Sequence, residues 1–216
     1  MKNLYSIIFI FILSLNTYSS SIGKVLFVKG NSFYKDSPSS KAKKVTKGLT
    51  FPEKTSFKTN EDSIVVLSLN NGSKIKINKN SQMTVMSDKS AITSGSSFFS
   101  ILKSKVRNNK KYKYQVKTKQ AAMGVRGTEF FVAYGKSKDS WMCVNEGLVE
   151  VQSHSSNKKV LVKSGEGVRI DGKVSDPKAL PWTKKLNWKM TGNASDLENK
   201  VSIEDAYSDP LDQDYD

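Results

Sequence analysis

The sequence predicts an all-β fold in which short antiparallel strands stack into a small sandwich or a solenoid-like domain. Apolar and polar residues alternate with a period of two from residue 23 to about residue 170. Clusters of turn-forming residues interrupt this alternation every 8–12 residues or so, the strand spacing typical of sandwiches, barrels and solenoids. No segment before residue 180 has the 3.6-residue period of a helix.

The expected strands follow one another with a turn between neighbours. Ser63–Leu69 is rich in β-branched residues, and Asn70–Ser73 then forms a tight turn, because Asn and Gly tolerate positive φ. Lys74–Asn78 alternates cleanly, which predicts one buried and one solvated face. The other expected strands share this alternation: Lys24–Val28, Gln82–Met86, Tyr112–Thr118, Thr128–Tyr134, Trp141–Val144, Leu148–Gln152, Val160–Val162 and Val168–Ile170.

The first twenty residues have the order of a secretory signal peptide. Lys2 supplies a positive charge, Ile7–Leu13 is an unbroken apolar run, and small residues follow. Cleavage is expected between Ser19 and Ser21, and no cysteine follows the apolar run as it would in a lipoprotein. The alternative of an uncleaved anchor stays open, although the run is shorter than the ~20 residues of a membrane span.

Four regions are expected along the chain. Residues 1–20 are a signal peptide, residues 21–171 a β domain, residues 172–193 a strap containing Pro and Trp, and residues 194–216 an acidic, disordered tail. Pro177 and Pro181 mark the change at the strap, because proline cannot donate to a strand ladder. Localisation in the periplasm or outside the cell follows from the signal peptide.

The net charge of +15 over 216 residues is unevenly placed. Residues 194–216 hold eight acidic residues and one lysine, whereas residues 21–193 hold 33 basic and 12 acidic residues, a net charge of +21. Only three of the basic residues are arginine. Because lysine lacks the bidentate fork on which sequence-specific nucleic-acid recognition relies, no nucleic-acid partner is expected. The lysines fit either a solvated surface or attraction to anionic lipid or polysaccharide.

Little in the sequence supports catalysis. Cys143 is the only cysteine, so no intrachain disulfide can form, and its apolar neighbours predict a buried, unreactive thiol. His154 is the only histidine and lies in a Ser-rich segment. No clustered metal ligands, nucleophile motif or phosphate-binding glycine loop is present, so no enzyme activity, metal or cofactor is expected.

The most informative stretch is Ala122–Val132, which reads Ala-Met-Gly-Val-Arg-Gly-Thr-Glu-Phe-Phe-Val. It resembles the signature of the FecR domain, in which a Gly-Val-Arg-Gly-Thr-x-Phe element ends one strand and starts the next. Four further blocks resemble that family in the same order, so the resemblance covers about residues 23–170: Gly23–Asn31, Asp62–Ile77, Val144–Val151 and Val162–Gly165.

The resemblance implies a stand-alone module of the bacterial envelope. Family members that regulate a sigma factor do so through a cytoplasmic segment and a membrane span, whereas here the expected signal peptide leads directly into the β domain. Neither sigma-factor control nor iron sensing is therefore implied for this chain, and no transmembrane span is expected in the mature chain.

Two interpretations of the motif at residues 124–129 remain open. In the structural one, Gly124 and Gly127 supply unusual backbone angles, Thr128 bonds the turn, and Arg126 pairs with Glu129 or Glu146. In the functional one, Arg126 is a fork that binds an anion. The candidate binding residues here are Arg126, Thr128 and Glu129, and the residues expected to serve the fold are Gly124, Gly127, Glu146 and Gly147.

Trp182 and Trp188 complete the candidate binding residues. They either anchor the strap on an open edge of the β domain or contact a membrane or a partner. The expected function is a non-enzymatic binding or signalling module that engages another envelope component. The alternative is an electrostatic binder of anionic lipid or polysaccharide that acts through a lysine-rich surface, for which residues 41–47 and 103–113 are the densest segments.

Overall fold

The computed structural model confirms the all-β fold. It describes residues 20–103, 114–135, 139–156, 158–193 and 197, and of Trp182 it describes the backbone alone. The predicted signal peptide lies outside these residues except for Ser20, and the predicted tail lies outside them except for Leu197. Within the described residues no helix is long and apolar enough to cross a membrane.

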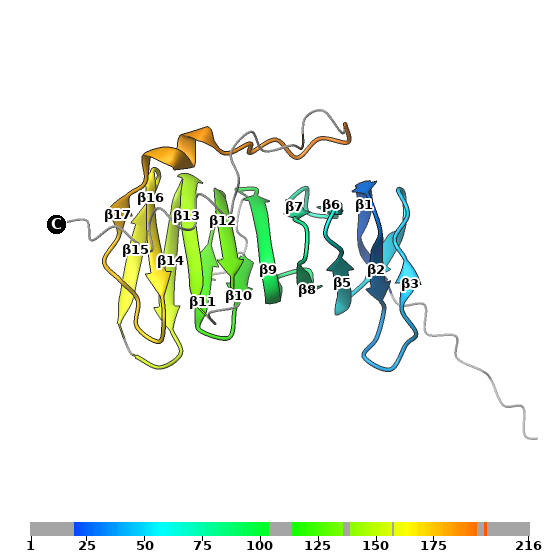
Figure 1. Ribbon diagram of the computed structural model, residues 1–216, viewed down its shortest axis with the longest axis horizontal. Helices are drawn as coiled ribbons and strands as arrows, with labels where there is room; N and C mark the ends of the chain where they lie inside the picture. Colours follow the sequence, from blue (N-terminus) through cyan, green and yellow to red (C-terminus); the bar gives the residue numbers. More distant parts are fainter. Residues whose placement is uncertain (1–19, 104–113, 136–138, 157, 194–196, 198–216) are drawn as a thin grey trace, which may run out of the picture.

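In the described part of the chain, seventeen strands form one hydrogen-bonded network that is folded into two layers, sheet A and sheet B, along the long axis of the molecule (Figure 1). In spatial order, sheet A consists of β4 (Thr50–Pro52), β1 (Ser21–Lys29), β6 (Ile64–Leu69), β7 (Lys74–Ile77), β9 (Lys89–Ile101), β12 (Thr128–Tyr134), β13 (Ser140–Glu146), β16 (Glu166–Ile170) and β17 (Lys178–Ala179). Sheet B consists of β3 (Lys43–Lys44), β2 (Ser32–Lys35), β5 (Thr55–Thr59), β8 (Gln82–Val85), β9 again, β10 (Tyr114–Lys117), β11 (Ala121–Val125), β14 (Leu148–Ser153) and β15 (Lys159–Lys163).

The long strand β9 belongs to both sheets and joins them. Its first half pairs with β8 and β10 in sheet B, and from Gly95 onward it pairs with β12 in sheet A. Gly95 has a φ of 79°, and a Cβ there would lie 2.5 Å from Cα of Ser81. Only glycine fits such a conformation and such a close approach, so Gly95 is where the chain changes layer.

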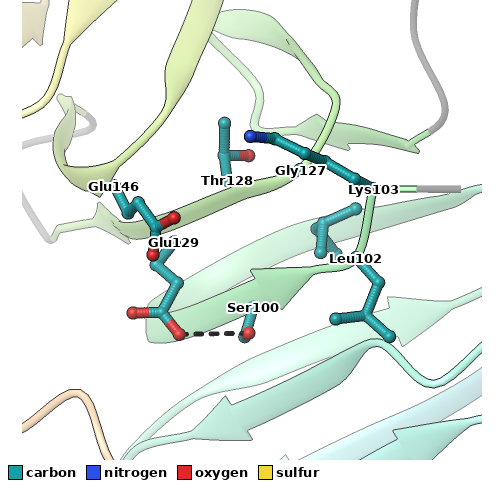
Figure 2. A pocket seen from close by; sticks show the side chains of 8 residues that line it. Ser100, Leu102, Lys103, Gly127, Thr128, Glu129 and Glu146 are labelled. Carbon is teal, nitrogen blue, oxygen red and sulfur yellow. Dashed lines mark hydrogen bonds between the residues drawn. The ribbon is translucent and has the colours of Figure 1, made fainter.

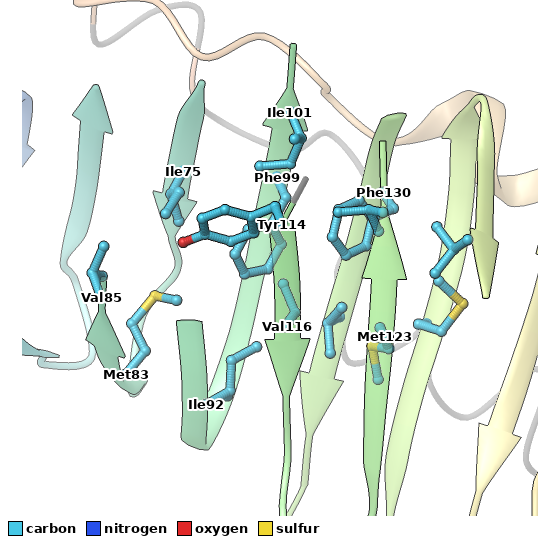
Figure 3. Close-up of a cluster of buried hydrophobic side chains, with 14 of the residues drawn as sticks. Ile75, Met83, Val85, Ile92, Phe99, Ile101, Tyr114, Val116, Met123 and Phe130 are labelled. Carbon is cyan, nitrogen blue, oxygen red and sulfur yellow. The ribbon is translucent and has the colours of Figure 1, made fainter. Parts of the chain in front are cut away.

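The main core fills the space between the two sheets. Both layers contribute, as Figure 3 shows for Ile75 and Phe99 of sheet A and for Met83 and Tyr114 of sheet B. Phe99 stacks on its cross-strand neighbour Phe130, with ring centroids 5.0 Å apart. Each strand points alternate residues inward, so the two-residue period of the sequence arises from their burial in this core.

A second apolar cluster lies on the outer face of sheet A, where the strap packs. The strap carries the 3-10 helix η1 (Pro181–Lys185) and runs along the sheet from β16 and β17 toward β1 (Figure 1). Leu180, Leu186 and Met190 of the strap are buried against Phe98 and Phe131 of the sheet. Leu197 is buried in the same cluster, so packing continues past the predicted end of the strap at residue 193. The strap therefore covers a face of the sheet and not an open edge.

The predicted strands agree with the structure in order and approximate bounds, except that residues 112 and 113 of the predicted strand Tyr112–Thr118 lie outside the described residues, and β12 matches residue for residue. β9, the longest strand, was not among the predicted strands, and neither were shorter ones such as β2 and β5. The middle of β9, Thr93–Ser97, is polar and includes Gly95, so the alternation that marks the other strands is lost there.

The strap requires a glycine in the strand beneath it, which gives a test of its placement. A Cβ on Gly167 would overlap Cδ1 of Leu180 and lie 2.7 Å from the carbonyl oxygen of Met142, although the φ of Gly167 is not in the left-handed region. Gly167→Ala is expected to lower the free energy of unfolding by roughly 1–3 kcal/mol in urea titrations, as overpacking does.

Gly192→Ala is the matched control, because the nearest contact of its added Cβ is an ordinary 3.7 Å from the carbonyl oxygen of Leu26. Both variants change the entropy of the unfolded chain alike. Equal stability of the two variants would contradict the placement of Leu180 over Gly167.

Candidate functional site

The outer face of sheet A carries two neighbouring cross-strand rows of different chemistry. The strand registers place one apolar row under the strap, consisting of Phe27, Val66, Lys76, Phe98, Phe131, Cys143 and Gly167. Two residues away on β6, β7, β9 and β12, and three residues away on β1 and β13, where the pairing is irregular, they place a polar row of Lys24, Ser68, Lys74, Ser100, Glu129 and Glu146. The strap thus covers the apolar row and runs beside the polar one.

Aromatic contacts hold the strap on the apolar row. Trp188 meets Phe98 edge-on, with ring centroids 5.1 Å apart, and its Nε1 donates a hydrogen bond to the carbonyl oxygen of Thr183 at 2.9 Å. Phe98 in turn contacts Phe131 at 4.7 Å. Edge-on and tilted ring pairs of this kind stabilise beyond the area that they bury. Trp188 is therefore an anchor of the strap, but it packs on a face of sheet A and not on the open edge that was predicted.

Lys76 is the one charged residue in the apolar row and is fully buried. Its Nζ donates hydrogen bonds to the carbonyl oxygens of Asn187, at 2.6 Å, and Lys189, at 3.4 Å, and lies 4.0 Å from the centre of the Phe98 ring. These contacts tie the backbone of the strap to β7, since a buried ammonium group needs such partners. Burial lowers the pKa of Lys76 to about 8.

A groove lies along the polar row between the strap and the motif at residues 124–129. It consists of two cavities of about 350 and 330 Å³ that share Ser100 and Glu129. The first cavity is shown in Figure 2. We call this site the polar groove, and its lining residues are Lys74, Ser100, Ile101, Leu102, Lys103, Gly127, Thr128, Glu129, Glu146, Trp188, Lys189 and Met190.

Glu129 lies where the two cavities meet. Its Oε1 accepts a hydrogen bond from Oγ of Ser100 at 3.2 Å (Figure 2), and its Oε2 accepts one from Nδ2 of Asn145 at 3.1 Å. Both donors are neutral, and among the described residues Glu129 has no ion pair. A half-buried carboxylate that is oriented but not neutralised favours binding of an ammonium or guanidinium group.

Thr128 forms part of the wall of the first cavity, and its side chain does not make the hydrogen bond that was predicted for it. Its side chain is buried, and among the described residues its Oγ1 has no hydrogen-bond partner. The prediction that Thr128 bonds the turn is therefore wrong. A buried hydroxyl without a partner destabilises a protein by roughly 1–3 kcal/mol, so the fold leaves a hydrogen-bonding group unsatisfied in a residue that lines the cavity.

Glycines shape this end of the groove. Gly127 has a φ of 65°, and a Cβ there would overlap the side chain of Lys103. Gly147 has a φ of 93°, and a Cβ there would lie 2.6 Å from Cγ2 of Thr128. Gly124 lies inside β11, opposite Gln115 and Glu150, and its φ is not positive, which corrects the prediction that it supplies an unusual angle.

The remaining predicted site residues are divided between the groove and its surroundings. Glu146 lines the groove, as does Trp188. Arg126 is exposed and forms no ion pair with Glu129 or Glu146, which contradicts the predicted pairing. Trp182 lies in η1, and its side chain is outside the described part of the chain.

Lys74, Ser100 and Asn145 were not among the predicted site residues. Ser100 lies in the unrecognised strand β9, and the strand assignment for residues 74–78 placed Lys74 on a solvated face without a neighbour. The registers of β7, β9, β12 and β13 were needed to bring these side chains together.

The described residues contain no group of three or more His, Cys, Asp or Glu side chains able to hold a metal ion. Cys143 is buried under the strap, as predicted, and burial raises the pKa of its thiol to about 12. The groups that the polar groove presents, such as the carboxylate of Glu129 and the hydroxyl of Ser100, can recognise a ligand by charge and hydrogen bonding.

The comparison with protein families agrees with the resemblance. Residues 55–150 match the family model described as FecR protein. These residues are a FecR domain. The FecR domain begins at β5 and ends in β14, so it contains both glycines that shape the groove and most of its lining. The strap, which supplies Trp188, Lys189 and Met190, lies outside the matched residues.

Two crystal structures, both of a candidate anti-sigma factor from Parabacteroides distasonis ATCC 8503, are similar to this chain. They share 18% and 20% sequence identity with it, and the TM-score is 0.48 for each. Each match covers 57% of this chain and 59% of the other, so the chain spans less than two thirds of those proteins. No curated protein matches this chain.

The buried Lys76 gives a pH-dependent prediction. Its pKa is about 8 in the folded protein and 10.5 for the ordinary side chain, so between these pH values the unfolded chain binds more protons. Stability contributed through Lys76 therefore rises with pH across this window. Relative to Lys76→Met, the wild-type free energy of unfolding is expected to increase on the order of 2–3 kcal/mol from pH 8 to pH 10.5.

Urea titrations at a series of pH values measure this difference, in which all other titrating groups cancel. Lys74→Met, two residues away in the polar row, controls for the loss of a lysine from β7. Parallel pH profiles for wild type and Lys76→Met would show that Lys76 is not buried by the strap.

Proposed function

We propose that this chain is a non-enzymatic FecR-type binding and signalling module, located in the periplasm or outside the cell, that binds another envelope protein in the polar groove. The observation that carries the proposal is the combination of Glu129 and Thr128 at one cavity. One is a carboxylate oriented by two neutral donors, and the other is a buried hydroxyl without a partner.

These two groups define what the groove would accept. Glu129 and the exposed Glu146 attract a positive group, and Oγ1 of Thr128 can accept a hydrogen bond from the same group or donate one to a neighbouring carbonyl. A lysine or arginine side chain of a partner protein meets both requirements. The cavity of about 350 Å³ lies at the lower end of the size of ligand sites, which suits one side chain with its adjoining backbone.

The overall charge of the chain restricts the binding of a basic partner to one place on the surface. Residues 21–193 carry +21, so most of the surface repels a basic partner and the acidic end of the groove is the exception. Such an arrangement selects one orientation of the partner, since electrostatic complementarity contributes to specificity and register. The proposed location follows from the charged, apolar and small-residue order of residues 1–20.

Photo-crosslinking in the producing cell tests the proposal. A photoreactive leucine analogue at Leu102, which is exposed and lines the groove, is expected to capture one discrete envelope protein, and capture should persist at high salt. The same analogue at the exposed Leu161 of sheet B should not capture that protein. The mass of the purified protein should at the same time correspond to cleavage between Ser19 and Ser21.

Thr128→Val separates binding from folding. Because the hydroxyl is buried without a partner, this isosteric change is expected to raise the free energy of unfolding by roughly 1–3 kcal/mol. It should nevertheless reduce capture at least tenfold, and Glu129→Gln should reduce capture to the same extent. Ser32→Ala removes another buried hydroxyl without a partner, far from the groove in β2, and should leave capture unchanged. Undiminished capture by Thr128→Val and Glu129→Gln would refute the proposed site.

A further inference from the structure

The outer face of sheet B differs from that of sheet A in both cover and charge. Side chains at its outward positions, such as Gln115 and Gln152, are half-buried or exposed, and none of the described segments packs over them. We call this surface the lysine face, because it carries seven lysines at outward strand positions: Lys35, Lys44, Lys58, Lys89, Lys117, Lys159 and Lys163.

The strand registers spread these lysines across the sheet. One cross-strand row contains Lys35 of β2, Lys117 of β10 and Lys159 of β15, and the residues between them are small or uncharged, such as Ala91 and Ala122. With strands about 4.8 Å apart, the charges in this row are about 19 and 14 Å from one another. The positive charge is therefore distributed over the whole face and not gathered at one point.

Little negative charge opposes it. In the strands of sheet B the only acidic residue is Glu150, whose Oε1 lies 3.7 Å from Nζ of Lys159. The other six lysines of the face form no ion pair with described residues. Their ammonium groups are free to meet an external anion.

Apolar side chains accompany the lysines. Of the four large exposed hydrophobic residues among those described, three point outward from this face, namely Phe33 at 36%, Leu148 at 45% and Leu161 at 52% exposure. Phe33 lies near one end of the sheet, whereas Leu148 and Leu161 lie on the last two strands at the other end. Basic residues that attract anionic headgroups and apolar residues that enter the interface are the two components with which amphipathic helices bind a bilayer surface, and the lysine face offers both.

From this arrangement we propose that the lysine face of sheet B binds the surface of an anionic lipid bilayer. Lysines spread over a face some 38 Å wide, which is eight strand spacings, match an extended charged surface better than a single chain in a groove. Lysine is a hydrated point charge suited to diffuse attraction, which needs no bidentate geometry. Phe33, Leu148 and Leu161 would enter the headgroup region.

The proposal concerns a different layer from the polar groove and does not depend on it. Sheet A lies about 10 Å from sheet B, and its outer face points the opposite way. A chain lying on a bilayer through sheet B would hold the polar groove away from the lipid, open to a partner.

Sedimentation with lipid vesicles tests the proposal on the purified protein. It is expected to bind vesicles of equal parts phosphatidylcholine and phosphatidylglycerol, to release them as salt is raised, and to bind pure phosphatidylcholine far more weakly. Replacing Lys35, Lys58 and Lys117 together by Gln should lower the partition coefficient roughly a hundredfold, since each lysine near an anionic leaflet contributes about a fivefold factor.

The matched control replaces Lys24, Lys173 and Lys184 together by Gln. These lysines are exposed and lie on sheet A, on the segment after β16 and in η1, so the net charge falls by the same amount while the lysine face stays intact. The control should bind within about twofold of wild type, because attraction beyond a Debye length of about 10 Å is screened. Equal losses in both triple variants would overturn the proposal in favour of net charge alone.

Two further measurements distinguish an anionic bilayer from a soluble polyanion as the ligand of the lysine face. Phe33→Ser combined with Leu161→Ser should weaken vesicle binding and leave its salt dependence unchanged. Binding of a soluble phosphate polymer should not depend on these two apolar side chains. Binding of soluble polyphosphate as tight as that of vesicles, and insensitive to the Phe33 and Leu161 changes, would overturn the bilayer in favour of a soluble polyanion. Glu129→Gln should bind vesicles as wild type does, so failure here and failure of the polar groove are distinguishable.

Discussion

The packing of the strap on sheet A is the interaction on which the rest of the surface depends. Sheet A is apolar on both sides, since its inner residues form the main core and its outer row includes Phe98 and Phe131. Without a cover, that outer row would be an exposed apolar patch of the kind that leads to association. Trp188 and Leu186 cover it, and Lys76 fixes the strap backbone to β7.

The position of the strap also determines where the polar groove lies. The extended segment after η1 places Trp188, Lys189 and Met190 beside Ser100 and Glu129, so one wall of the groove comes from the strap and the other from the motif of the FecR domain. Gly127 and Gly147 allow Lys103 and Thr128 to pack closely at the far end. The glycines of the motif therefore serve the fold and also shape the cavity, whereas Arg126, the expected anion-binding fork, is not among the residues that line the groove.

The sequence predicted the strands well and the site only in part. Alternation reports burial on one side, and it located strands such as β12 because their inner residues face a single core. Alternation could not reveal β9, because the chain changes sheets there through a polar segment at Gly95. It also could not reveal that Lys76 is buried, because the cover over this second face comes from residues more than one hundred positions away. Glu129 was found from the motif, whereas its partners Ser100 and Asn145 follow only from the strand registers.

The reactivity of the single thiol of the chain is the most direct test of whether the strap covers sheet A. Cys143 is fully buried in the cluster beneath the strap, and no other cysteine exists to react. In native buffer, modification of wild-type protein by a maleimide should be as slow as global unfolding allows, and replacing Leu186 and Met190 together by Ala should accelerate it at least tenfold while circular dichroism still shows folded β structure. Rapid modification of the folded wild-type protein, or equal rates in both proteins, would contradict the covering of sheet A by the strap.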